Sequence, residues 1–120
     1  TWVCLQYGDV KEDLERARSS GADMAYWPES IADLDEFAAL ISNLDLVITV
    51  CNTTVHYAGA LNVPTWVMAP KYPEWRYGVS QRTLPWYPAT RVYRQEVAGD
   101  WPPLIDRIGT LLADVEPAPG

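Results

Sequence analysis

The chain of 120 residues is poor in the residue types that build metal and redox sites. It has one histidine, His56, and two cysteines, Cys4 and Cys51. A structural zinc site needs four ligands, so we expect no metal. Both cysteines lie in or beside apolar, strand-like segments, which indicates buried free thiols rather than a disulfide. One histidine near one cysteine, without a third partner, also argues against nucleophilic catalysis.

Long apolar runs and the common phosphate-binding signatures are absent as well. No segment is apolar enough to cross a bilayer, the chain does not begin with Met, and no signal peptide is evident. We therefore expect a fragment or processed piece of a cytoplasmic protein. The net charge of −7 argues against a nucleic-acid partner. The sequence has neither Gly-x-Gly-x-x-Gly, nor a Gly-Lys-Ser/Thr loop, nor a Gly-x-Ser-x-Gly elbow.

The chain has enough apolar residues for one domain, because 48% of them are hydrophobic. Strands are expected over residues 2–6, 24–27, 46–50, 65–68 and 91–94. Helices are expected after a capping box at Asp9 and Glu12, over 33–43 and 55–62, and after a cap at Asp100. The alternation predicts a three-layer α/β fold with a Rossmann-like parallel sheet and right-handed crossovers.

The central stretch runs from Asp45 to Leu61. Its β-branched apolar run predicts a strand buried on both faces, followed by a polar turn over 51–54 and a close-packed helix. Thr53 or Thr54 is expected to cap that helix. A helix N-terminus at the carboxyl end of a parallel strand favours anions, because free N–H groups and the positive end of the dipole converge there.

The polar residues placed to use such an anion site are Asn52, Thr53, Thr54 and His56. The imidazole of His56 can donate to a phosphate oxygen or cap a nearby carbonyl, and spacing does not separate these alternatives. The whole pattern is also that of an ordinary capped turn between a strand and a helix.

A second candidate region is the segment from Pro70 to Pro88, which is rich in Pro, Trp and Tyr. Loops of this length in compact domains are often functional. The candidates for lining a cleft are Lys71, Trp75, Arg76 and Trp86. Cations there can pair with a diphosphate and aromatic rings can stack on a base or sugar, or both can simply pack on the domain. We predict that the turn over 51–56 and the loop over 71–82 share one cleft at the carboxyl edge.

Several segments resemble one family of enzymes. The run Leu46-Val47-Ile48-Thr49-Val50-Cys-Asn-Thr-Thr-Val-His-Tyr-Ala-Gly-Ala-Leu-Asn-Val-Pro-Thr-Trp-Val is similar to the C-terminal domain of bacterial glycosyltransferases of the heptosyltransferase (family 9) type. The closest similarity is to the version attached to tetratricopeptide repeats. Further matching segments are Leu5-Gln6-Tyr7-Gly8, Pro73-Glu74-Trp75-Arg76-Tyr77, Pro85-Trp86-Tyr87-Pro88, Arg91-Val92-Tyr93-Arg94-Gln95 and Asp100-Trp101.

The resemblance implies the GT-B architecture, in which two Rossmann-like domains enclose the active site and the C-terminal one binds a nucleotide-sugar donor without metal. Residues 1–115 would be a partial, truncated C-terminal domain, and 116–120 a flexible tail. Carried over by position, Asn52, Thr53 and Thr54 would lie at the donor diphosphate or sugar, with His56 close to the phosphates. The implied partners are a nucleotide sugar, an N-terminal GT-B domain and tetratricopeptide repeats. A strand in the middle of the sheet would be missing.

One position departs from the family. Heptosyltransferases typically carry Asp at the end of the central strand, where this chain has Cys51, so the sugar need not be a heptose. The leading hypothesis is the donor-binding part of a glycosyltransferase that is not active alone. The alternative is a non-catalytic binding or scaffold domain that keeps the fold. A flavodoxin-like signalling domain is a third reading, but it lacks its acidic or phosphate-loop residues.

Overall fold

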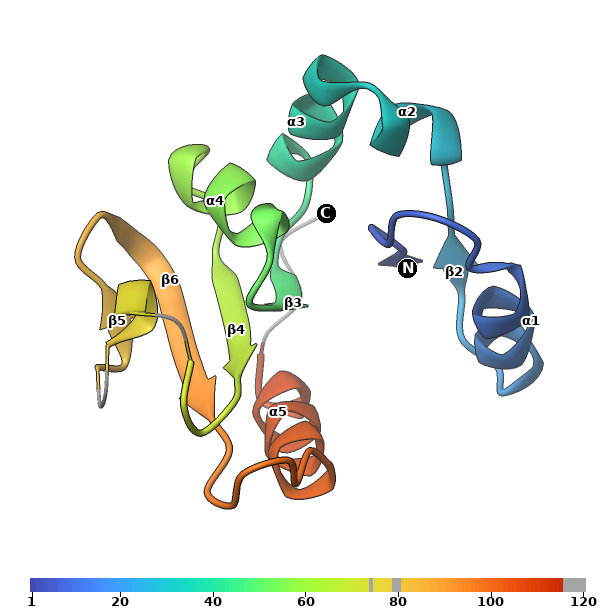
Figure 1. Cartoon of the computed structure of the whole chain (residues 1–120). Coiled ribbons are helices and arrows are strands. Elements are labelled where there is room, and N and C mark those ends of the chain that lie inside the picture. The colour runs from blue at the N-terminus through green and yellow to red at the C-terminus, as the bar shows by residue number, and fades with distance from the viewer. Residues whose placement is uncertain (74, 79–80, 116–120) are drawn as a thin grey trace. The chain divides into compact units, whose positions relative to one another are not determined.

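The computed structural model describes residues 1–73, 75–78 and 81–115, so the expected tail at 116–120 lies outside the described residues. The chain forms two compact units, 1–40 and 41–120. Figure 1 shows their elements in chain order.

The first unit is a small parallel β-α-β arrangement with further helices. It contains β1 (Trp2–Val3), α1 (Lys11–Ser19), β2 (Met24–Ala25), α2 (Pro28–Ala32) and most of α3 (Leu34–Ser42). Trp2 pairs with Met24, and Val3 with Ala25. Both strands are therefore shorter than expected. Pro28 occupies the first turn of α2, where its missing N–H costs nothing.

The ends of the helices in this unit differ from expectation at one point. The capping box at Asp9 and Glu12 is wrong: Val10 is the N-cap residue and makes no side-chain cap. Its side chain is buried, and Asp9 only accepts a bond from the Lys11 N–H at 3.2 Å. α1 ends shortly before Gly21, whose φ of 94° is the left-handed conformation that glycine commonly adopts after a helix.

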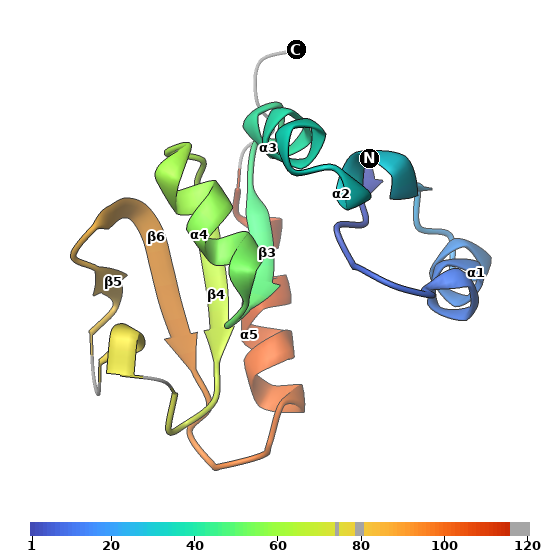
Figure 2. The ribbon, with the colours of Figure 1, turned by 45° about the horizontal axis from the view of Figure 1, so that its top comes forward.

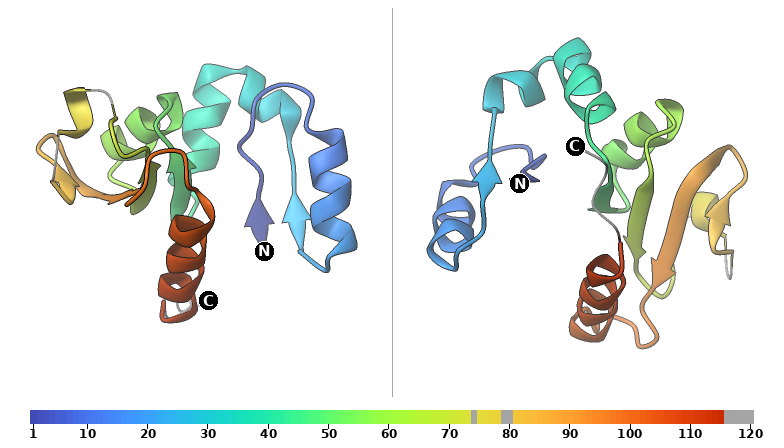
Figure 3. Two further views of the ribbon diagram at one scale, coloured as in Figure 1. Left: turned by 60° about the horizontal axis from the view of Figure 1, so that its bottom comes forward. Right: turned by 180° about the vertical axis from the view of Figure 1, so that it is seen from behind.

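The second unit holds a four-stranded sheet with the order β3-β4-β6-β5. Its elements are β3 (Val47–Val50), α4 (Thr53–Ala60), β4 (Thr65–Ala69), the 3₁₀ turn η1 (Trp75–Tyr77), β5 (Thr83–Leu84), β6 (Tyr87–Arg94) and α5 (Pro102–Ala113). β3, β4 and β6 are parallel, and β5 is antiparallel to β6. The views in Figures 2 and 3 show α4 and α5 on opposite faces of this sheet.

The chain is therefore an α/β protein, and its described strands form two separate sheets, one in each unit. One expectation about the strands is wrong: in the described residues, β3 is an edge strand and is not buried on both faces. Val47 is buried, whereas Val50 is 43% exposed.

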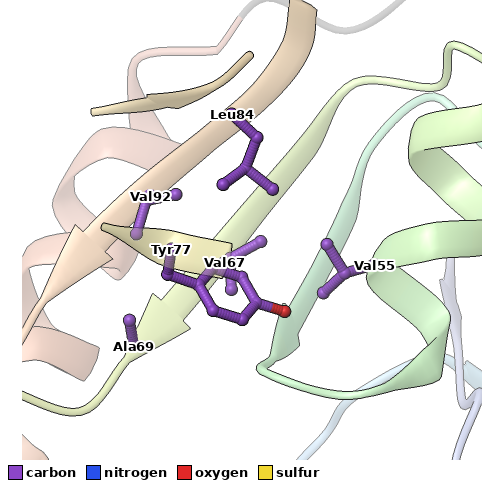
Figure 4. Close-up of a cluster of buried hydrophobic side chains, with 6 residues drawn as sticks. All are labelled: Val55, Val67, Ala69, Tyr77, Leu84 and Val92. Carbon is purple, nitrogen blue, oxygen red and sulfur yellow. The ribbon is translucent and has the colours of Figure 1, made fainter. Parts of the chain in front are cut away.

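The main apolar core lies between the sheet and α4. It consists of Val55, Val67, Ala69, Tyr77, Leu84 and Val92, as Figure 4 shows. The residues of β4 and β6 alternate between the two faces, as the pleat requires. Tyr77 comes from η1, so the loop after β4 supplies part of the core. This packing holds the loop over the same face as α4.

The opposite face is covered by α5. Tyr93 makes an edge-to-face contact with Trp66, and the Arg107 guanidinium lies 5.3 Å from the Tyr93 ring centre. The expected cap at Asp100 is wrong, because Trp101 is the N-cap residue and makes no side-chain cap. On this helix Leu104 and Ile108 are buried, whereas Ile105 is 54% exposed. No helix in the described ranges is long and apolar enough to cross a membrane.

Candidate functional site

Asn52 caps the helix that begins at the carboxyl end of β3. Its side-chain Oδ1 accepts from the Thr54 N–H at 3.1 Å, and its backbone is extended. The expectation that Thr53 or Thr54 caps this helix is therefore wrong. The helix begins two residues earlier than expected, at Thr53, which makes the asparagine before it the cap.

The cap fixes which side of the Asn52 amide faces outward. Oδ1 accepts from the Thr54 N–H, which can only donate, and from the Thr49 hydroxyl at 3.1 Å. The amide cannot be turned over without losing the bond to Thr54, so Nδ2 is directed away from these partners. Because Asn52 is exposed, this NH₂ group is available to a ligand.

Part of the helix N-terminus is already occupied by the protein itself. The Val55 N–H bonds to the Asn52 carbonyl at 3.2 Å, and the Thr54 N–H to the Asn52 side chain. Within the described residues, the Thr53 N–H and the hydroxyls of Thr53 and Thr54 have no hydrogen-bond partner. One backbone N–H, two hydroxyls and one amide thus remain as donors at the positive end of the helix dipole.

His56 lies one turn further along α4, and its imidazole caps no carbonyl among the described residues. Its Nδ1 lies 3.0 Å from the Tyr87 hydroxyl, and the two rings meet edge to face with centres 5.8 Å apart. Tyr87 is the first residue of β6. The structure therefore gives His56 a partner that neither sequence-based alternative included.

Arg94 joins the end of β6 to the loop that follows β4. Its guanidinium donates to the backbone carbonyls of Tyr77, of Gly78 at 3.3 Å and of Gln81 at 3.0 Å. Burial lowers the pKa of Arg94, while the electrostatic effect of nearby Cys51 opposes this shift. An arginine stays protonated at neutral pH, so a positive charge lies beside the residue that precedes the cap.

This arrangement brings the polar turn and the aromatic loop to one edge of the sheet. Tyr77 of the loop packs in the same buried cluster as Val55 of α4 (Figure 4). Arg94 interacts with Cys51 electrostatically and holds the loop by three carbonyls. The segments that were expected to converge are neighbours, although a shared cleft remains a prediction.

The candidate residues of the loop form exposed cation–aromatic pairs. The Lys71 ammonium lies 5.8 Å from the centre of the Tyr72 ring, and the Arg76 guanidinium 5.0 Å from that of Trp75. Trp75 is 77% exposed. The Lys71 backbone is tied to the end of β6, because its N–H donates to Oε1 of the buried Gln95 at 3.3 Å.

Trp86 is not brought to this edge. It lies in the turn between β5 and β6, where Leu84 pairs with Tyr87. β6 runs parallel to β4, and Thr65 pairs with Thr90, so the turn lies at the amino end of the parallel strands. Trp86 is therefore separated from Lys71, which follows the carboxyl end of β4.

A cavity of about 300 Å³ lies where β6 ends and α5 begins. It is lined by Arg94, Glu96, Val97, Asp100, Pro103, Leu104 and Arg107. Its lining includes none of the four residues expected at the anion site. Acidic and basic side chains are mixed there, so it has no clear preference for an anion. Among the described residues, no three His, Cys, Asp or Glu side chains gather as a metal site would require.

Three of the residues that organise this region were part of the resembling segments but were not predicted as site residues: Tyr87, Arg94 and Gln95. A partial signal was present for Arg94. Thr90, Val92 and Arg94 alternate along β6, so Arg94 falls on the buried face of the strand. A cation on such a face needs partners, which the loop carbonyls supply.

The fold and this site define an α/β protein with a polar helix start at the carboxyl edge of a parallel sheet. The chain is similar to Protein FlbA of Caulobacter vibrioides, with 37% identity over 116 residues, covering 94% of this chain and 19% of FlbA. The chain thus spans about a fifth of the length of this curated relative, whose name states no reaction or substrate. No family model matches the chain, and no solved structure does.

Proposed function

We propose that this chain is the donor-binding part of a glycosyltransferase that uses a nucleotide-diphosphate sugar. The observation that carries the proposal is the start of α4. Asn52 caps the helix and keeps its amide nitrogen outward, while Thr53 and Thr54 keep donors unpaired among the described residues. A dianionic diphosphate is the ligand that such a set of donors at a helix N-terminus suits best.

The local charges support this assignment. The chain carries a net charge of −7, which would repel a diphosphate at most of its surface. Near the start of α4, however, Arg94 interacts electrostatically with Cys51, and the adjoining loop contributes Lys71 and Arg76. In the proposed reaction these cations and the helix N-terminus stabilise the negative charge of the leaving diphosphate. No residue of this chain is proposed as a general base.

The aromatic residues of the loop are suited to bind the nucleoside part of a nucleotide-sugar donor. Tyr72 and Trp75 are 79% and 77% exposed, and each carries a cation beside its ring. Exposed aromatic side chains of this kind stack on nucleobases with little sequence preference. We therefore place the nucleoside over the loop and the diphosphate at α4. The resemblance to the GT-B glycosyltransferases agrees with this division, and the further GT-B domain and the repeats it implies belong to the same proposal.

Cys51 favours a second candidate function, a non-catalytic binding or scaffold domain. The thiol stands where the resembled enzymes carry a carboxylate that would contact the donor sugar. A domain that has lost this contact can keep the diphosphate site without catalysing transfer of the sugar. Binding of a nucleotide without transfer would distinguish this candidate from the enzyme.

The test is isothermal titration calorimetry of the folded chain with UDP, GDP, ADP and their sugar conjugates, without metal. We expect one nucleotide to bind saturably. Asn52→Asp should keep the helix cap but replace the outward amide by a negative charge, and so weaken binding at least tenfold.

The matched control is Asn62→Asp. Asn62 lies just past the other end of α4, is exposed and has a φ of 55°, which Asp also tolerates. This change adds the same charge away from the proposed site and should alter affinity less than twofold. Equal losses in both variants, or no nucleotide bound by the folded wild-type chain, would contradict the proposal.

A further inference from the structure

The contact between His56 and Tyr87 defines which nitrogen of the imidazole remains free. Nδ1 of His56 lies 3.0 Å from the Tyr87 hydroxyl. No other hydrogen-bond or charged partner of the imidazole occurs in the part of the chain that the structure describes. One ring nitrogen is thus engaged by the protein, and Nε2 is left for a ligand.

The position of Tyr87 is set by a glycine on the same helix. A Cβ atom added at Gly59 would lie 2.4 Å from Cγ of the Tyr87 ring, which is closer than real Cβ contacts come. Gly59 is buried in α4, three residues after His56. The ring therefore lies directly on the helix backbone, and its hydroxyl reaches the imidazole one turn nearer the helix start.

The chemistry of the pair favours one arrangement of its protons. A phenol is the stronger donor and a neutral imidazole nitrogen the stronger acceptor, which favours the tautomer in which the Tyr87 O–H donates and Nδ1 accepts. A neutral imidazole carries one proton, and a lone pair engaged at Nδ1 leaves that proton on Nε2. The free nitrogen of His56 is then a hydrogen-bond donor, which is what a phosphate oxygen requires.

Tyr87 starts β6 at the amino end of the parallel strands, and its hydroxyl reaches His56 on α4. We propose that Tyr87 is a positioning residue for the donor site: it holds His56 in the tautomer whose Nε2–H donates to a diphosphate oxygen. This inference rests on the proposed function for the identity of the ligand. The tautomer and its dependence on Tyr87 do not rest on it. Tyr87 itself need not touch the ligand, because it acts through His56.

The first experiment reads the tautomer directly. His56 is the only histidine, so ¹⁵N-histidine labelling of the chain gives the two nitrogen resonances of a single ring. At about pH 8.5, we expect a protonated, pyrrole-type Nε2 and a hydrogen-bonded acceptor Nδ1. Tyr87→Phe should move the Nδ1 resonance downfield, because the donor is lost while the ring that packs on Gly59 is kept.

Tyr93→Phe is the control for this experiment. It removes a hydroxyl from the same strand, but Tyr93 packs against Trp66 and Arg107 on the other face of the sheet. It should leave both nitrogen resonances in place. A protonated Nδ1 in the wild-type chain, or a Tyr87→Phe spectrum that equals the wild-type one, would overturn the proposal.

The second experiment tests whether Tyr87 acts through His56. With the nucleotide diphosphate that the calorimetric series identifies, Tyr87→Phe should weaken binding about fivefold. A loss of this size corresponds to the net contribution of one neutral hydrogen bond. In a His56→Ala background, Tyr87→Phe should not weaken nucleotide binding any further. Equal losses in both backgrounds would overturn the proposal. Absence of nucleotide binding, with the nitrogen spectra as expected, would reject the donor site and leave the Tyr87–His56 assignment standing.

Discussion

Gly59 and Gly109 both lie in helices, but only Gly59 faces a neighbour. A methyl group at Gly59 would overlap the Tyr87 ring, whereas a methyl group at Gly109 would have no neighbour within 4 Å among the described residues. The glycine in α4 is therefore required by packing, and the glycine in α5 is not.

We predict opposite effects when each is replaced by alanine. Gly59→Ala should destabilise the chain by about 2 kcal/mol, since overpacking a core costs ~1–3 kcal/mol. Gly109→Ala should stabilise it by up to about 1 kcal/mol, the helix-propensity difference. Urea unfolding followed by circular dichroism measures both. A Gly59→Ala chain as stable as the wild type would show that Tyr87 does not pack as described.

The N-cap of α4 gives a second prediction at the residue scale. Asn52→Ala removes the acceptor of the Thr54 N–H and should cost about 1 kcal/mol of unfolding free energy. Asn52→Asp keeps an acceptor at the same place and should cost little. The same urea measurement applies, and similar losses in the two variants would contradict the cap.

The sequence predicts which residue types form this site better than it predicts the contacts that they make. Asn52, Thr53 and Thr54 could be selected because a polar turn between an apolar strand and a helix is a local pattern. Which of them caps depends on where the helix begins, and that boundary was missed by two residues. The Tyr87 partner of His56 is 31 residues away in the chain, and no local pattern encodes such a contact.

At the scale of elements, Arg94 is the link between β6 and the loop after β4. Three loop carbonyls depend on its guanidinium, and burial lowers its pKa without removing its charge. Lysine carries the same charge but cannot reach several carbonyls with one planar group.

We predict that Arg94→Lys loosens the loop selectively. Amide exchange of residues 75–78 should become at least tenfold faster, because fewer of the carbonyl bonds can be remade. Residues 65–69 of β4, which pair with both neighbouring strands, should keep their exchange rates. Hydrogen–deuterium exchange with mass spectrometry measures both segments. Unchanged exchange at 75–78 would show that the arginine does not hold the loop.

Most of the helices and strands could be predicted from the hydrophobic periodicity of the sequence and from the positions of Gly and Pro. The strand, helix and strand from β3 to β4 follow the expected order, and Asn62 takes the left-handed conformation that ends the helix. β6 is twice as long as expected, because Tyr87 and the residues after it pair with β4 and β5. α2 was not among the expected helices, because Pro28 directly follows an apolar segment and a proline there can mark the end of a strand as well as the start of a helix.

At the scale of the whole molecule, the sheet of the second unit ends at β3. An apolar, β-branched strand suggests a central position in the sheet. The order of the strands, however, depends on pairing with distant segments, which the residues of one strand do not determine. In the described residues, β3 pairs only with β4. The expectation that a strand is missing from the middle of the sheet, and the assignment of residues 1–115 to one partial domain, stay predictions.

The free edge of β3 has a measurable consequence. The Val47 N–H bonds to the Pro64 carbonyl at 2.9 Å. Alternate residues of a parallel strand direct their N–H groups toward the same neighbouring strand. The Thr49 N–H therefore also points toward β4, whereas those of Ile48 and Val50 point away from it. We predict that the amides of Ile48 and Val50 exchange at least tenfold faster than those of Val47 and Thr49. Residue-resolved exchange by NMR checks this, and equal protection of all four would mean that the other edge is covered.

The most direct test of the donor-site account is chemical-shift mapping by NMR as the nucleotide diphosphate is added to the ¹⁵N-labelled chain without metal. The account predicts saturable changes at the amides of Asn52–His56 and of residues 75–78, with the Asn52 side-chain amide among the largest. Residues 9–15, which form an acidic surface on the other unit, should not change. Saturable changes confined to the cavity between β6 and α5, or no changes in a folded chain, would contradict it.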